Sequence, residues 1–97
     1  GEQAEPRPAL LIPMGEAATT EALKRARQWW AEGAAVQVET RGANLKKALQ
    51  TANRQGFTRA LILGEGELAA GTITVKDLAT GAQEAWPLEE VPSRLRS

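Results

Sequence analysis

Two short runs of apolar residues place the strongest constraint on how this chain folds. Residues 9–12 (ALLI) stand directly before Pro13, and residues 60–63 (ALIL) stand directly before Gly64. A continuous apolar run of this length is typical of a β-strand that is buried on both faces. Pro13 has no N–H group to donate to a neighbouring strand, so it marks the end of the first strand. The chain is therefore expected to form a sheet with helices on both sides.

The segment after the first strand has the apolar periodicity of an amphipathic helix. Thr19 or Thr20 is the predicted N-cap, and the helix is expected to continue to about Glu32, before Gly33. Its apolar stripe consists of Ala22, Leu23, Ala26, Trp29 and Trp30. Two adjacent tryptophans cannot both face the centre of one stripe. One is expected in the core and the other at its edge, over a loop or a partner, where it could stack on a base.

A second amphipathic helix is predicted from its N-cap, Asn44, to the residues before Gly56. Its apolar residues follow the helical spacing i, i+3, i+4 and i+7, at Leu45, Ala48, Leu49 and Ala52. Lys46 and Lys47 fall on the outer face of this helix.

The remaining segments predict three more strands and a short final helix. Residues 34–39 and 72–76 alternate between apolar and polar side chains, and residues 82–86 form a short last strand. Residues 34–39 fit a strand near a sheet edge, with Glu39 on its polar face. Residues 65–71 are expected to be a polar connection between strands, and residues 88–95 a short helix.

The resulting order, β-α-β-α-β-β-β-α, predicts an α/β fold. Strands that alternate with helices in the first half imply right-handed crossovers and three parallel strands. The short glycine-containing connections that follow imply antiparallel additions. We expect a three-layer α/β/α sandwich around a five-stranded mixed sheet. Residues 8–97 form one domain in this interpretation, and residues 1–7 are a linker or a cloning remnant.

Composition excludes several classes of site. The 97 residues contain neither cysteine nor histidine, which removes disulfides, thiolate metal sites and histidine-dependent catalytic triads. The apolar runs are far shorter than the roughly 20 residues that a membrane-spanning helix needs. The N-terminus lacks the hydrophobic core of a signal peptide. We therefore expect a cytoplasmic protein with no membrane partner.

The net charge of zero conceals a segregation of charge along the chain. Residues 41–64 carry five basic residues and no acid, whereas residues 65–90 carry six acids and only Lys76 as a base. A basic patch in the first segment can bind phosphates even though the whole chain is neutral. The alternative is that these charges form an ordinary solvated helix face.

No catalytic constellation stands out. Residues 64–67 (GEGE) lack the Lys-Ser/Thr ending of a phosphate-binding loop. Glu65 and Glu67 have no basic or histidine partner close in sequence, and residues two apart in a loop need not converge. Arg41 and Asn44 follow the end of a strand, where open α/β sheets bind ligands, and a helix N-terminus there offers amide donors to an anion. An ordinary N-cap followed by solvated lysines explains Asn44 equally well.

Three motifs together resemble a known family. They are residues 11–16 (LIPMGE), 41–47 (RGANLKK) and 63–78 (LGEGELAAGTITVKDL). In this order and at these separations they resemble the C-terminal anticodon-binding domain of class IIa aminoacyl-tRNA synthetases, and within that class the histidyl-tRNA synthetases. The resemblance spans roughly residues 8–96. Residues 49–53 (LQTAN) depart from the LKYAD that is common in the family, and the adjacent Trp29 and Trp30 are unusual for it.

This resemblance implies a fold, a partner and a set of contact residues. The family sheet has strand order 2-1-3-4-5 with one antiparallel strand, and it binds the anticodon loop of tRNA. The parent enzymes are cytoplasmic homodimers that use ATP and magnesium in a separate catalytic domain. This chain contains none of the class II catalytic motifs, so we expect no cofactor and no enzymatic activity in it. The implied tRNA contacts are Met14, Glu16, Arg41, Gly42, Asn44, Lys46, Lys47, Glu65, Glu67 and Lys76.

Two other functions are compatible with the sequence. A synthetase-like module without catalysis could regulate or bind another protein, as the zero net charge and the tryptophan pair suggest. A small α/β ligand-binding domain or carboxylate enzyme is a third interpretation, and it requires a pocket lined by Glu65 and Glu67.

Overall fold

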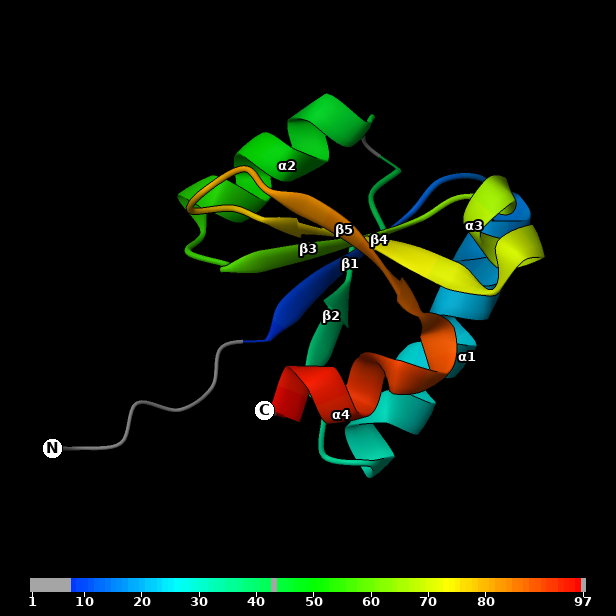
Figure 1. Cartoon of the computed structure of the whole chain (residues 1–97). Helices are drawn as coiled ribbons and strands as arrows, with labels where there is room; N and C mark the ends of the chain where they lie inside the picture. Colours follow the sequence, from blue (N-terminus) through cyan, green and yellow to red (C-terminus); the bar gives the residue numbers. More distant parts are fainter. Residues whose placement is uncertain (1–7, 43, 97) are drawn as a thin grey trace, which may run out of the picture.

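The computed structural model describes residues 8–42 and 44–96. Along the chain it contains β1 (Ala9–Pro13), α1 (Glu16–Ala31), β2 (Val36–Val38), α2 (Leu45–Arg54), β3 (Arg59–Leu63), α3 (Glu65–Ala70), β4 (Thr72–Asp77), β5 (Gln83–Pro87), a 3-10 turn (Leu88–Glu90) and α4 (Val91–Arg96) (Figure 1). The predicted linker, residues 1–7, lies outside the described residues. In the described part of the chain, no helix is long and apolar enough to cross a membrane.

The five strands form one mixed sheet in the order β2-β1-β3-β4-β5. β1 pairs in parallel with β2 and with β3, whereas β4 is antiparallel to both β3 and β5. α2 covers one face of this sheet, and α1 and α4 cover the other (Figure 1). The predicted fold class, strand order and single antiparallel strand are therefore confirmed.

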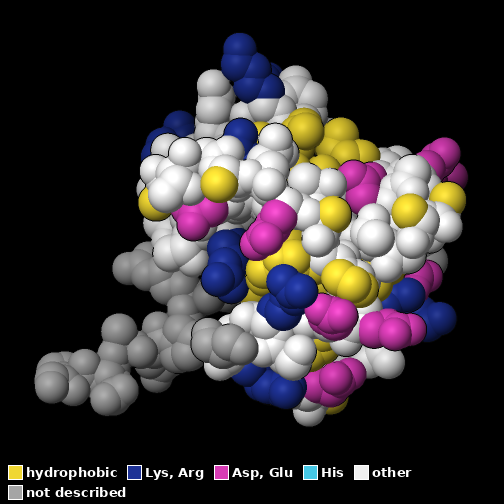
Figure 2. Space-filling view, viewed as in Figure 1, with side chains coloured by type: hydrophobic (Ala, Val, Ile, Leu, Met, Phe, Trp, Pro, Cys, Tyr) yellow, Lys and Arg dark blue, Asp and Glu magenta, His cyan; other side chains and the backbone are white. Residues whose placement is uncertain are grey.

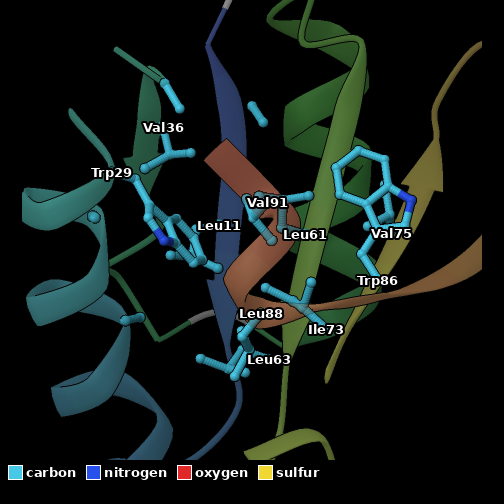
Figure 3. Packing of buried hydrophobic residues seen from close by; sticks show 14 of the residues in the cluster. Leu11, Trp29, Val36, Leu61, Leu63, Ile73, Val75, Trp86, Leu88 and Val91 are labelled. Atoms are coloured by element: carbon cyan, nitrogen blue, oxygen red, sulfur yellow. The ribbon is translucent and has the colours of Figure 1, made fainter. Parts of the chain in front are cut away.

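The apolar runs of β1 and β3 supply the core on both faces of the sheet. Because successive side chains of a strand point to opposite faces, Leu11 and Leu61 lie on the α1 side, and Leu10 and Ala60 lie on the α2 side. The cluster on the α1 side is the larger one. Figure 3 shows it between Trp29 of α1 and Trp86 of β5, with Leu11 and Leu61 among the residues between them.

The structure corrects the predicted start of the first helix. α1 begins at Glu16 with Gly15 as its N-cap, four or five residues before the predicted caps. The Thr19 and Thr20 hydroxyls instead donate to the backbone carbonyls of Gly15 and Glu16, at 2.8 and 3.3 Å, inside the helix. The additional turn buries Ala18. Leu23, predicted on the apolar stripe, is 48% exposed because the stripe consists of Ala18, Ala22, Ala26 and Trp29.

The predicted polar connection of residues 65–71 is wrong in one respect, because residues Glu65–Ala70 form a short helix, α3. The Glu67 carboxylate accepts a hydrogen bond from the Gly64 N–H at 2.9 Å, which stabilises the first turn. Gly71 ends the helix in the left-handed conformation, with φ +74°. Six residues are too few to produce a recognisable helical period.

The two adjacent tryptophans divide as predicted. Trp29 is 2% exposed in the core, whereas Trp30 is 57% exposed. The Trp30 indole Nε1 donates a hydrogen bond to the Val36 carbonyl, 2.6 Å away on strand β2. The ring therefore lies against the edge of the sheet.

Substitution of the two tryptophans should have unequal effects on stability. We expect Trp29→Ala to lower the free energy of unfolding by about 3–5 kcal/mol, because it leaves a cavity in the larger core cluster. Trp30→Ala should cost about 1 kcal/mol, since it removes one hydrogen bond and partly exposed surface. Urea denaturation followed by circular dichroism measures both values. Equal losses would contradict the assignment of Trp29 to the core.

Candidate functional site

Most of the predicted contact residues gather at one end of the sheet, where the carboxyl ends of the parallel strands lie. The parallel strands β1, β2 and β3 all end there, and the loops that follow them carry Met14, Arg41 and Glu65. β4 runs in the opposite direction, so Lys76, near the carboxyl end of β4, lies towards the other end of the sheet. The strand directions therefore bring most of the set together and leave Lys76 apart.

The loops after β1 and β3 are in direct contact. The Met14 N–H donates to the Leu63 carbonyl at 2.9 Å. A carboxylate oxygen of Glu65 lies 3.6 Å from the position that a Cβ atom would occupy on Gly15. Glu65 and Glu16 are the exposed first residues of α3 and α1. This end of the sheet consequently presents two carboxylates to solvent.

Glu67 holds α3 against β4. Its Oε1 accepts from the Gly64 N–H and its Oε2 accepts from the Thr74 hydroxyl, both at 2.9 Å. The Thr74 hydrogen bond is the main cause that lowers the pKa of Glu67, the Gly64 N–H adds to it, and burial opposes it. A Cβ on Gly64 would lie 2.9 Å from Oε1, so glycine permits this close approach. The carboxylates of Glu65 and Glu67 thus contact different groups and do not form an acid/base pair.

Lys76 lies on the same face of the sheet as Thr74, because the two residues are two apart on β4. This is the face that α2 covers, since Thr74 and Lys76 pair with Ile62 and Ala60. Beside α2 the side chain of Lys76 lines a hollow of about 240 Å³ together with Leu49, Gln50, Asn53 and Leu78. Glu67 and Lys76 therefore approach one surface from two sides, with Thr74 between them.

Arg41 is held by a carboxylate that the sequence analysis did not select. Glu39 follows β2, and its side chain is 5% exposed. It accepts hydrogen bonds from the Arg41 backbone N–H at 2.8 Å, from Nε at 3.2 Å and from Nη2 at 3.0 Å. The Arg41 side-chain hydrogen bond is the main cause that lowers the pKa of Glu39, and the same bond raises the pKa of Arg41. The pair could have been predicted from the sequence, because an acidic residue stands two positions before an arginine at the end of a predicted strand.

The start of α2 confirms the predicted N-cap. The Asn44 side chain accepts a hydrogen bond from the Lys47 N–H at 2.9 Å. Lys46 and Lys47 are exposed on the first turn, and Gly42 is exposed with φ +73°. In the space-filling view, Lys and Arg side chains project from the end of the molecule where α2 lies (Figure 2). Among the described residues, no group of three or more acidic residues could hold a metal ion.

Comparisons with known proteins identify one family. Residues 9–97 match the family model described as the anticodon binding domain. The histidine–tRNA ligase of Nocardia farcinica is 42% identical over 86 residues, which cover 89% of this chain and 20% of that protein. The corresponding ligase of Gluconacetobacter diazotrophicus is 41% identical over 88 residues, 91% of this chain and 21% of that protein. The chain thus spans about a fifth of the length of these relatives.

Solved structures show the same fold. The histidyl-tRNA synthetase of Nostoc sp. PCC 7120 superposes with a TM-score of 0.86 and 26% identity, over 95% of this chain and 22% of that chain. The RNA binding domain of threonyl-tRNA synthetase from Cryptosporidium parvum Iowa II gives a TM-score of 0.83 at 21% identity, over 94% of this chain and 23% of that chain. At that identity the second structure supports the fold alone.

The role of Glu67 predicts a pH dependence of stability. The pKa of Glu67 in the folded chain is lower than the ordinary 4.5. The ionised Glu67 carboxylate therefore makes its full contribution to the free energy of unfolding at pH values above 4.5, and this contribution is lost as the pH falls through the lowered pKa. Glu67→Gln should therefore reduce the free energy of unfolding at neutral pH, by about 1 kcal/mol, because the amide lacks the negative charge that strengthens the hydrogen bonds from Gly64 and Thr74. The difference from the wild type should shrink at about pH 3.

Urea unfolding at a series of pH values measures this difference. Glu65→Gln is the matched control, because it removes a carboxylate from the same helix without disturbing the contacts with Gly64 and Thr74. A Glu67→Gln penalty that is the same at acidic and neutral pH would contradict the role assigned to the Glu67 carboxylate.

Proposed function

The chain belongs to the anticodon-binding domain family, and from this we propose that it is the anticodon-recognition module of a histidine–tRNA ligase. The match over residues 9–97 carries the proposal, because it includes every strand of the sheet. Relatives more than 40% identical that are named histidine–tRNA ligases support the choice of tRNA. Aminoacylation, with its ATP and magnesium, would be the work of a catalytic domain outside this chain. We further propose that the parent protein is a cytoplasmic homodimer.

We assign RNA binding to the part of the sheet beside α2. The hollow at Lys76 is lined by Gln50 and Asn53, whose amides both donate and accept hydrogen bonds. Such groups suit the edges of bases that are splayed out of a single-stranded loop, which is the usual target of sequence-specific RNA recognition. Glu67 retains free lone pairs beyond its two bonds and can accept from a base amino group.

The exposed first turn of α2 suits the RNA backbone. Lys46 and Lys47 are solvated cations beside a helix N-terminus, where phosphate is favoured. The remaining predicted contacts border this surface at the carboxyl ends of the parallel strands: Met14, Glu16, Gly42, Asn44 and Glu65. In this proposal the lysines of α2 contribute affinity, and the hollow at Lys76 contributes sequence discrimination.

A direct test compares two RNA hairpins. Fluorescence anisotropy would measure binding of the chain to the anticodon stem-loop of histidine tRNA and to the same hairpin with a scrambled anticodon. We expect tighter binding of the first hairpin and a decrease of both affinities with salt. Equal affinities for the two hairpins, or no binding, would contradict the proposed function.

Two lysine variants separate discrimination from affinity. We expect Lys76→Ala to reduce the ratio of the two hairpin affinities by about tenfold, because a base contact is lost. Lys46→Ala should lower the slope of log affinity against log salt by roughly 0.7 and leave the ratio unchanged, since one phosphate contact is lost. If both variants keep the wild-type ratio and slope, the site residues are wrong.

A second candidate function has one observation in its favour. Leu23 and Trp30 are 48% and 57% exposed, and their separation of seven places them on one side of α1. A non-catalytic synthetase-like module could use this side to bind another protein. Normal folding without any RNA binding would favour this alternative.

A further inference from the structure

A second polar hollow lies on the opposite flank of α2, between this helix and strand β2. It has a volume of about 200 Å³, and its lining includes Gln37, Glu39, Thr40, Arg41, Thr51 and Gln55. On the helix, Thr51 and Gln55 face away from Leu49 and Asn53, which line the hollow at Lys76. The volume is below the range of about 300–1,000 Å³ for pockets of drug-sized ligands and suits a smaller group.

Glu39 fixes the direction of the Arg41 guanidinium. A guanidinium has five N–H donors in a rigid plane, and Nε and Nη2 each use one of them on the buried Glu39 carboxylate. Three N–H donors remain, on Nη1 and on the outer side of Nη2. Because the Arg41 side chain is 65% exposed, these donors are accessible to a ligand. They present a fork that is already oriented before anything binds.

The charge of this hollow argues against a phosphate ligand. Glu39 and Arg41 are the charged side chains among its described lining residues, and together they have no net charge. A phosphate bound to Arg41 would also meet the nearby Glu39 carboxylate. The other polar lining side chains are neutral amides and hydroxyls, which suit an uncharged ligand with hydrogen-bond acceptors.

We propose that this hollow is a base-binding subsite for the RNA, in which Glu39 positions Arg41 to donate two hydrogen bonds to N7 and O6 of an unstacked guanine. Guanine presents these two acceptors on one edge, and the arginine fork matches them. Gln37, Thr51 and Gln55 supply neutral donors and acceptors for the remaining base atoms. This proposal rests on the function proposed above, and it makes Arg41 a specificity-determining residue rather than a phosphate contact.

The first experiment compares Arg41→Lys with Lys47→Ala in the same anisotropy assay. Lysine keeps the charge of Arg41 and loses the fork, so we expect about tenfold weaker binding of the histidine tRNA stem-loop. The dependence on salt should stay at the wild-type slope. Lys47→Ala, on the exposed start of α2, should instead lower the slope by roughly 0.7. Wild-type affinity of Arg41→Lys would overturn the proposal.

The second experiment removes one acceptor from the RNA. Each guanine of the hairpin loop is replaced in turn by 7-deazaguanine, which has C–H in place of N7. At one loop position we expect about tenfold weaker binding to the wild type and little effect on Arg41→Lys, because that variant has already lost the bidentate contact. Equal sensitivity of both proteins at every position would also overturn the proposal.

Glu39→Gln tests the positioning role. Without its carboxylate partner, Arg41 is no longer fixed and its charge is no longer compensated. We expect weaker discrimination of the deaza substitution together with a steeper salt dependence. Circular dichroism establishes that the variant is folded; if it is not, Arg41→Lys still tests the base contact of Arg41. A purely structural role for Glu39 would leave the salt slope unchanged.

The outcomes separate this proposal from the function on which it rests. If the wild type does not distinguish the two anticodons, the proposed function is wrong. If the wild type distinguishes them and Arg41→Lys keeps the wild-type affinity and salt slope, only the base-binding subsite is wrong.

Discussion

The parallel pairing of β1 with β3 is the constraint on which the rest of the structure depends. Both strands are almost wholly buried, so each face of the pair needs its own covering helix. Parallel strands also require crossovers, and these place the loops after β1, β2 and β3 at the same end of the sheet. The antiparallel β4 then extends the sheet beyond α2 and leaves Lys76 beside an uncovered hollow. Both hollows beside α2 thus follow from how the central strands pair.

Two carboxylates hold the loops at that end of the sheet. Glu67 joins α3 to Gly64 and Thr74, and Glu39 fixes Arg41. The backbone N–H groups of Thr80 and Ala79 lower the pKa of Asp77, and the charge of Arg59, its neighbour across β3 and β4, adds a smaller contribution. The charge segregation along the sequence is therefore partly cancelled in the fold, and Figure 2 shows basic and acidic side chains interspersed over β5 and α4. Among the described residues, no acidic side chain forms an ion pair with the exposed Lys46 or Lys47 of α2.

The sequence predicted the strands and the division of the tryptophans, because burial on both faces and helical spacing leave clear periodic patterns. The strand order was implied by the resemblance to the family and not by these patterns. It predicted the Asn44 cap, which uses a local hydrogen bond. It did not predict α3, which is too short to have a period, or the start of α1, where Gly15 rather than a threonine precedes the helix. The Glu39–Arg41 pair was missed because alternation assigned Glu39 to an exposed face. The site residues themselves remain predictions.

The indole of Trp30 has a consequence for assembly. β2 is an edge strand of three residues, and an edge strand offers its free backbone groups to any other strand that approaches. Trp30 occupies the Val36 carbonyl on this strand, and so it obstructs the addition of a further strand there. A strand from another molecule cannot pair with the Val36 carbonyl while this hydrogen bond is present. A side chain that is more than half exposed thus disfavours edge-to-edge pairing at this carbonyl of β2.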